Sequence, residues 1–362
     1  MFKRYTVLLI AAGLFAVLSA GCEPKETVSP RETAAIAETP DIRDYGGGQE
    51  VSYENFLKLV PGMTSDEVSE LLGLYEMGES AETGDFSYNY QSGLANVGIS
   101  VSFSDYRMVS ASFMDFLDMA FEPVGVTSEQ FDLLEPGMSY DEIKGIIGAE
   151  GNLEFIYAAD ADFNPNYKYV WASQNNGFNY RRISATLDGG MDAVFFTQDD
   201  LTMCEENAWL DYSLYRDIEV GIGFGQLEDS LGFMPGRHYS EKGADYSTDV
   251  YLYEDSSYAN QIEFIFIDGA MYKKNVLRYT DEFFEIRTVS GEAADIIGAK
   301  MTEGEVTELL GAEGFLVSGY VSANSRESRV GTYNWNVGDG GYLQILFTDG
   351  AIFNEGSIVR GY

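Results

Sequence analysis

Two kinds of hydrophobic pattern alternate along residues 51–362. Short stretches with apolar residues three and four positions apart come first, and runs with apolar residues at every second position follow them. The first pattern is typical of amphipathic helices and the second of half-buried β-strands. Because this order recurs along the chain, the sequence predicts groups of helices that alternate with groups of antiparallel strands.

One helix-forming motif occurs four times. Its copies are PGMTSDEVSELLG (61–73), PGMSYDEIKGIIG (136–148), VGIGFGQLEDSLG (220–232) and AKMTEGEVTELLG (299–311). In three copies a Thr or Ser precedes a Glu by three residues, the spacing of a capping box, namely Thr64–Glu67, Ser139–Glu142 and Thr302–Glu305. A glycine that suits a helix C-cap closes each copy, at Gly73, Gly148, Gly232 and Gly311. Since a short amphipathic stretch precedes each copy, we expect two short helices in each group.

Strand signals follow each pair of expected helices. The apolar residues at alternate positions are Ile99, Val101 and Phe103; Ile183, Ala185 and Leu187; Ile262, Phe264 and Phe266; and Leu343, Ile345 and Phe347. Asp268-Gly269 and Asp349-Gly350 predict hairpin turns after two of these runs. This repeated order predicts an α+β fold of four tandem helix-helix-antiparallel-sheet repeats, at residues 51–123, 124–205, 206–288 and 289–362. The helices should cover one face of the sheet and leave the other exposed.

An earlier strand of each group carries aromatic residues on one side. The candidates for a binding role are Tyr88, Tyr90, Tyr169, Trp171, Tyr251, Tyr253, Tyr333 and Trp335. Polar residues alternate with these rings, which favours packing of the rings against the helices. The alternative is an exposed aromatic platform for a protein or glycan partner.

The first fifty residues predict a targeting signal and a linker. Residues 1–21 have the features of a secretory signal peptide, with Lys3 and Arg4 before an apolar run that is too short to span a bilayer comfortably. The small residues that end at Gly21 and precede Cys22 resemble the cleavage site of bacterial lipoproteins, in which the cysteine becomes the lipidated N-terminus. An ordinary signal peptide with a chance cysteine is the alternative. Residues 22–50 are rich in Glu, Thr, Pro and Gly and predict a flexible tether.

Composition and charge exclude several classes of function. The chain has 59 acidic and 22 basic residues and a formal net charge of −37, which argues against a nucleic-acid partner. One histidine, His238, and two cysteines leave little material for zinc, haem or a Ser-His-Asp triad. With Cys22 lipidated, Cys204 could form no disulfide within the chain, and we expect it to be a small buried or edge residue. We expect His238 to be a surface residue and the protein to need no cofactor.

Two motifs resemble ligand-binding loops. Gly221, Gly223 and Gly225 are spaced like part of a dinucleotide loop, but Gln226 stands where that pattern requires its third glycine. Residues 160–166 alternate Asp and Asn as calcium loops do, but Pro165 and Trp171 occupy the positions that an EF-hand reserves for Gly and Glu. A helix entry and a solvated loop are the favoured interpretations, and calcium binding at Asp160, Asp162 and Asn164 remains the alternative for the second.

Two short motifs resemble the repeat of the β-lactamase-inhibitor protein (BLIP) family. They are Gly62-Met63-Thr64 with Val68, and the hairpin Phe347-Thr348-Asp349-Gly350. The helix-helix-sheet unit is also similar to that of the small SmpA/OmlA-type lipoproteins, which assist outer-membrane protein assembly. The resemblance covers residues 51–362 and implies BLIP-like repeats that bind another protein. The disulfides of the BLIP family cannot form here, and residues 91–96 lack the Asp and Tyr of its contact loop, so no inhibitory residue can be assigned.

These observations lead to one functional hypothesis. The chain is expected to be a lipid-anchored, non-enzymatic protein-binding module on the extracytoplasmic face of the cell membrane. Its expected partner is another envelope or secreted protein, with a basic surface that complements the acidic chain. The alternatives are an envelope assembly factor of the SmpA/OmlA type and a cell-wall glycan-binding protein or hydrolase.

Overall fold

The computed structural model describes residues 51–361 apart from 74–76, 81–84, 92–96, 116–121, 174–179, 203–207, 281–282 and 323–327. The chain divides into two compact units, Met1–Gly46 and Gly47–Tyr362, and every described residue lies in the second. The predicted signal peptide, its cleavage site at Gly21, the lipidated Cys22, the tether and Cys204 therefore lie outside the described residues. Within the described part, no helix has both the length and the apolar character needed to cross a membrane.

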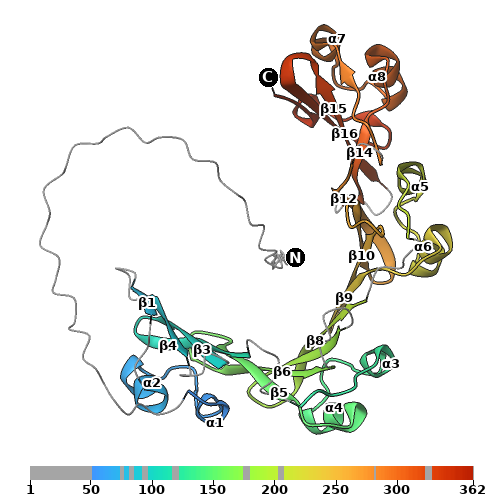
Figure 1. Cartoon of the computed structure of the whole chain (residues 1–362). Helices are drawn as coiled ribbons and strands as arrows, with labels where there is room; N and C mark the ends of the chain where they lie inside the picture. The colour runs from blue at the N-terminus through green and yellow to red at the C-terminus, as the bar shows by residue number, and fades with distance from the viewer. Residues whose placement is uncertain are drawn as a thin grey trace, which may run out of the picture. The chain divides into compact units, whose positions relative to one another are not determined.

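Short helices and longer strands alternate in the second unit (Figure 1). The helices are α1 (Tyr53–Phe56), α2 (Ser65–Leu72), α3 (Ser128–Asp132), α4 (Tyr140–Ile147), α5 (Tyr212–Asp217), α6 (Phe224–Leu231), α7 (Gly291–Ile296) and α8 (Glu303–Leu310), with 3₁₀ turns η1 (Gly338–Gly340) and η2 (Glu355–Ser357). The strands are β1 (Met77–Ser80), β2 (Phe86–Gln91), β3 (Val97–Ser104), β4 (Arg107–Asp115), β5 (Asn152–Ala158), β6 (Pro165–Ala172), β7 (Tyr180–Leu187), β8 (Ala193–Leu201), β9 (Arg237–Gly243), β10 (Tyr246–Glu254), β11 (Gln261–Ile267), β12 (Ala270–Arg278), β13 (Thr288–Val289), β14 (Phe315–Val321), β15 (Arg329–Val337), β16 (Gly341–Thr348), β17 (Ala351–Ile352) and β18 (Ile358–Gly361).

The expected fold of four helix-helix-sheet repeats is wrong, because the strands do not form separate sheets. Strand β4 pairs with β5, β8 with β9, and β12 with β14, so a single sheet of 18 strands runs through the described residues. Its pairings are antiparallel except that of β13 with β15. The helices are only four to eight residues long and contribute far less of the chain than the strands. An edge strand leaves backbone N–H and C=O groups unpaired, and pairing with the next group of strands satisfies them.

Local sequence signals account for the ends of the helices. All three predicted capping boxes form, at Thr64–Glu67, Ser139–Glu142 and Thr302–Glu305. A fourth forms between Thr127 and Gln130 at the start of α3. Gly148, Gly232 and Gly311 adopt the left-handed conformation expected at a C-cap, whereas Gly73 combines a φ of 83° with a ψ of −155°. These caps satisfy backbone groups that helices of this length would otherwise expose.

The hydrophobic cores lie between the helices and one face of the sheet. Val68 and Leu72 of α2, for example, pack with Ile99, Val101 and Phe103 of β3. Two of the cores continue across a pairing between strand groups. The first includes Leu153 and Ile156 of β5, and another joins α5 and α6 to Phe315 and Leu316 of β14. The sheet therefore has a face covered by helices and an opposite face, which we call the open face.

Candidate interaction face

The strand registers align seven side chains in one row across the open face. They are Arg182 (β7), Asp199 (β8), Tyr239 (β9), Val250 (β10), Ile265 (β11), Lys273 (β12) and Tyr320 (β14). All seven are partly exposed. With about 4.8 Å between neighbouring strands, this central row extends for about 29 Å. The row thus presents aromatic, aliphatic and charged groups side by side on adjacent strands of one sheet.

Over β2–β4 the side chains of the open face are small and polar. Ser102 of β3 lies between Ser87 of β2 and Ser110 of β4, and the hydroxyls of Ser87 and Ser102 are 3.0 Å apart. In the next row Ser100 lies between Asn89 and Ser112. Small polar side chains offer little apolar area to a protein partner. This serine-lined part of the face therefore contrasts with the central row and provides a natural control for it.

Charged groups on the open face gather over β5–β9. The Glu154 carboxylate pairs with the Arg182 guanidinium, and its Oε2 lies 3.9 Å from Lys168 Nζ. Arg237 donates two hydrogen bonds to the Asp199 carboxylate, at 2.9 and 2.7 Å. We call Glu154, Lys168, Arg182, Asp199 and Arg237 the cationic patch, because three cations contact two carboxylates there.

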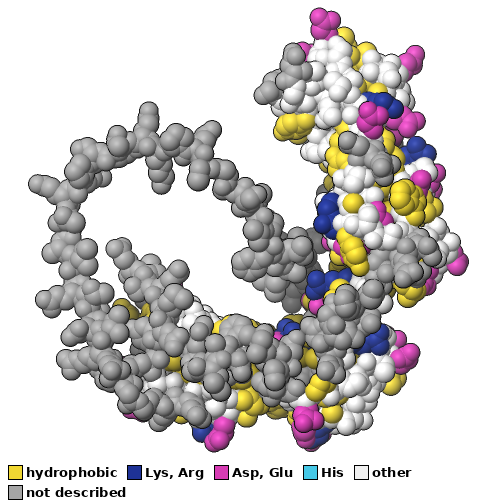
Figure 2. All heavy atoms as spheres, in the orientation of Figure 1, with side chains coloured by type: hydrophobic (Ala, Val, Ile, Leu, Met, Phe, Trp, Pro, Cys, Tyr) yellow, Lys and Arg dark blue, Asp and Glu magenta, His cyan; other side chains and the backbone are white. Residues whose placement is uncertain are grey.

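Three of the helices are purely acidic. Helices α2, α6 and α8 contain Asp and Glu but no Lys or Arg. Figure 2 shows Asp and Glu side chains, in magenta, on the parts of the surface formed by the helices. In a chain with a net charge of −37, the cationic patch is therefore a local exception.

The eight aromatic candidates lie on the helix-covered face. Five of them are buried, with exposed fractions of 0–8%, namely Tyr90, Trp171, Tyr251, Tyr253 and Trp335. The other three, Tyr88, Tyr169 and Tyr333, are partly buried and pack against the cores. The indole N–H of Trp171 donates to the Ala149 carbonyl at 2.9 Å. The structure thus places these rings where they pack, and a binding role for them stays a prediction.

His238 is partly buried and has polar neighbours, contrary to the expectation of a surface residue. Its Nε2 lies 3.2 Å from Asp249 Oδ1 and 3.1 Å from Ser240 Oγ, and its ring stacks on Tyr251 at 4.2 Å. In a hydrolase triad the carboxylate holds the histidine nitrogen that does not face the serine. Here the serine and the carboxylate contact the same nitrogen, and Ser240 also donates to Asp249. This geometry does not prepare Ser240 as a nucleophile.

The two loops that resemble ligand sites have structural roles. Gly223 is the N-cap of α6, so the glycine-rich stretch is a helix entry and does not follow a strand. In the other loop, Asp160 Oδ1 accepts hydrogen bonds from the amides of Asp162 and Asn164, and the Asn164 side chain donates to Asp160 Oδ2 at 2.8 Å. Across the described residues, no group of three or more His, Cys, Asp or Glu could hold a metal ion. Calcium binding at Asp160, Asp162 and Asn164 stays the untested alternative to the favoured solvated loop.

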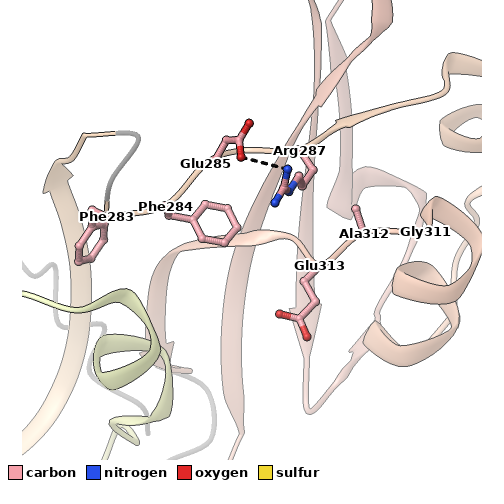
Figure 3. Close-up of a pocket in the computed structure, with 7 residues that line it drawn as sticks. All are labelled: Phe283, Phe284, Glu285, Arg287, Gly311, Ala312 and Glu313. Carbon is pink, nitrogen blue, oxygen red and sulfur yellow. Dashed lines mark ion pairs between the residues drawn. The ribbon is translucent and has the colours of Figure 1, made fainter.

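A shallow pocket of about 500 Å³ lies beside the segment that precedes β13 (Figure 3). Phe283, Phe284, Glu285, Arg287 and residues 311–313 line it. Glu285 and Arg287 form an ion pair of 3.0 Å with each other, and both side chains are more than 60% exposed. Phe284 stacks on Phe315 at 4.8 Å and belongs to the neighbouring core. Because Glu285 and Arg287 pair with each other and Glu313 pairs with Arg216 outside the lining, we assign no ligand to this pocket.

Comparisons with known proteins find likenesses only among solved structures. No family model matches the chain, and no curated protein does. Among solved structures, the chain is similar to a protein from Streptococcus mutans described as a "putative beta-lactamase inhibitor protein", with 19% identity and a TM-score of 0.29. The match covers 42% of this chain and 90% of that one. A likeness at this score supports no conclusion about fold or function, so the resemblance to the BLIP family rests on the sequence motifs.

Proposed function

We propose that this chain is a non-enzymatic protein-binding module that contacts its partner through the open face of the sheet. The observation that carries the proposal is the central row, in which tyrosine, aliphatic and charged side chains are partly exposed on seven adjacent strands. Tyrosine and arginine carry much of the binding energy of protein interfaces. The central row with a row on each side covers about 600 Å², close to one partner's share of a standard interface.

The proposed partner is another envelope or secreted protein. The net charge of −37 attracts basic partners at long range, which raises the rate of encounter without fixing the docked position. The sequence of residues 1–50 supports secretion, cleavage after Gly21, lipidation of Cys22 and a tether that leaves the second unit close to a membrane surface.

Paired variants test the role of the open face. Tyr239→Ala combined with Ile265→Ala removes two large side chains from the central row. The matched control combines Ser100→Ala with Ser102→Ala on the serine-lined part of the same face. We expect the first variant to reduce partner capture from cross-linked envelope extract at least tenfold and the control to leave it unchanged. Equal capture by both would contradict the proposal, as would release of soluble sugars from cell-wall fragments by the purified chain.

A further inference from the structure

An irregularity in β5 places Glu154 between two cations of the open face. The register of β5 against β6 shifts between Leu153 and Phe155, so Glu154 is an additional residue in the strand. Its carboxylate contacts Arg182 of β7 and lies within 3.9 Å of Lys168 of β6. Both cations meet the same oxygen, Oε2. One carboxylate thus serves two cations whose side chains are only about 30% exposed.

The other carboxylate of the cationic patch, Asp199, does not neutralise the second of these two cations. Asp199 lies opposite Arg182 across β7 and β8, but both of its oxygens accept hydrogen bonds from Arg237. Burial and the nearby Arg182 guanidinium lower the pKa of Lys168, and the Glu154 carboxylate opposes this effect. The patch therefore holds one more positive charge than its own carboxylates neutralise, and an additional anion would stabilise it.

Aromatic rings border the cationic patch. Phe155 and Tyr157 of β5 lie on the open face with their ring centres 5.4 Å apart, and Phe155 is paired in register with Lys168. Asn166 donates a hydrogen bond of 3.0 Å to the Tyr157 hydroxyl, which helps to fix the position of that ring. A charge-assisted hydrogen bond is stronger in such a partly desolvated environment than in water.

We propose that the cationic patch receives an Asp or Glu side chain of the protein partner. This inference rests on the proposed function, because it assigns one contact within the open face. The Arg182 guanidinium offers the planar set of N–H donors that matches a carboxylate, and Lys168 adds a second charge. Long-range attraction of a basic partner is compatible with this contact, since steering depends on the whole charge and docking on local pairs.

The inference can be tested without the partner. N-acetylglutamate N-methylamide and its glutamine analogue differ in the carboxylate and serve as probes. In NMR titrations of the second unit within the full chain, the glutamate probe should shift the Arg182 Nε–H signal, whereas the glutamine probe should not. Glu154→Gln removes the competing carboxylate and should tighten binding of the glutamate probe at least threefold, whereas Arg182→Gln should weaken it at least tenfold.

Three outcomes would overturn the inference. They are equal shifts with both probes, loss of binding in Glu154→Gln when the amide spectrum shows a folded chain, and binding of inorganic phosphate as tight as that of the glutamate probe. The last result would identify a site for small anions. The comparison of the two probes on the wild-type chain still tests the inference even where a variant fails to fold. If the variant with Tyr239→Ala and Ile265→Ala still captures the partner while the glutamate probe still binds to the wild-type chain, the proposed function fails and the anion site remains.

Discussion

The backbone amide of Leu153 donates a hydrogen bond of 2.6 Å to the hydroxyl of Tyr53, one hundred residues earlier in the chain. The relationship recurs between Leu316 and Tyr212, at 2.7 Å and a separation of 104 residues. In each case the tyrosine is the first residue of a short helix and accepts a hydrogen bond from the first strand of the next strand group. These contacts cross the pairings of β4 with β5 and of β12 with β14, where the cores are also continuous.

Tyr212→Phe should destabilise the second unit. The hydroxyl of Tyr212 also donates to the Gly314 carbonyl at 3.3 Å, and the residue is 8% exposed. Its removal leaves the buried Leu316 amide without an acceptor, which costs about 1–3 kcal/mol. Urea denaturation measures the free energy of unfolding. Tyr258→Phe, on a ring that is 48% exposed, is the control and should change that free energy by less than about 0.5 kcal/mol. Equal effects of the two variants would show that the buried hydrogen bond contributes little.

The protein should lose stability between pH 10 and pH 12. Burial raises the pKa of Tyr212 to about 12. An unfolded tyrosine releases its proton near pH 10, so the unfolded chain binds fewer protons than the folded chain in this window, and stability falls as pH rises. Tyr212 alone should contribute a loss of about 2–3 kcal/mol by pH 12. Urea denaturation at pH 9, 10, 11 and 12 tests this, and Tyr212→Phe should show a smaller loss than the wild type.

Lys274 should give the opposite dependence at lower pH. In its protonated form, Nζ donates to the carbonyls of Tyr215, Arg216 and Ile218 at 2.6–2.9 Å, and burial lowers its pKa to about 7. Between pH 7 and the ordinary pKa of 10.5, the unfolded chain binds more protons, so stability rises with pH. The increase from pH 7 to pH 9 should be about 2–3 kcal/mol.

The comparison of two lysine variants isolates this effect. Lys274→Met should remove the increase in the free energy of unfolding between pH 7 and pH 9. Lys273→Met, on the open face next to it in sequence, should keep the increase. A Lys274→Met chain with the wild-type pH profile would mean that the buried amine does not titrate in this range.

Two glycines in the last part of the chain should respond in opposite directions to Ala. A Cβ on Gly314 would lie 2.3 Å from the Trp335 ring, which is 1% exposed. Gly314→Ala should therefore destabilise the chain by about 1–3 kcal/mol through overpacking. A Cβ on Gly304, within α8, would point into open space, so Gly304→Ala should stabilise the helix by about 0.5–1 kcal/mol. Thermal denaturation gives both signs, and a stabilising Gly314→Ala would refute the close packing against Trp335.

Features encoded over a few residues could be predicted from the sequence. The capping box of Thr64 and Glu67 depends on a spacing of three residues, and the hairpin turn at Asp268-Gly269 depends on a dipeptide with positive φ at both positions. The alternation of Ile99, Val101 and Phe103 likewise identified a strand with one buried face. These signals concern one helix end, one turn and one strand.

Relationships between strands could not be predicted in the same way. The pairing of β8 with β9 joins backbone groups and leaves no motif in the side chains, so four separate sheets were expected where one exists. The neighbours of His238 depend on the register of β9 against β10, which places Tyr251 opposite His238 and Asp249 opposite Ser240. The cationic patch was missed for the same reason, because its residues come from β5 to β9 and meet only in the folded sheet.

Site-specific photo-cross-linking tests the use of the open face most directly. A photoreactive phenylalanine would replace Tyr239 in the central row in one chain and Glu308, on the acidic α8, in another, with both chains expressed in their native envelope. The account predicts a cross-linked protein at position 239, identified by mass spectrometry, and none at position 308. Cross-links to the same protein at position 308 and none at position 239 would place the binding surface on the helices and contradict the account.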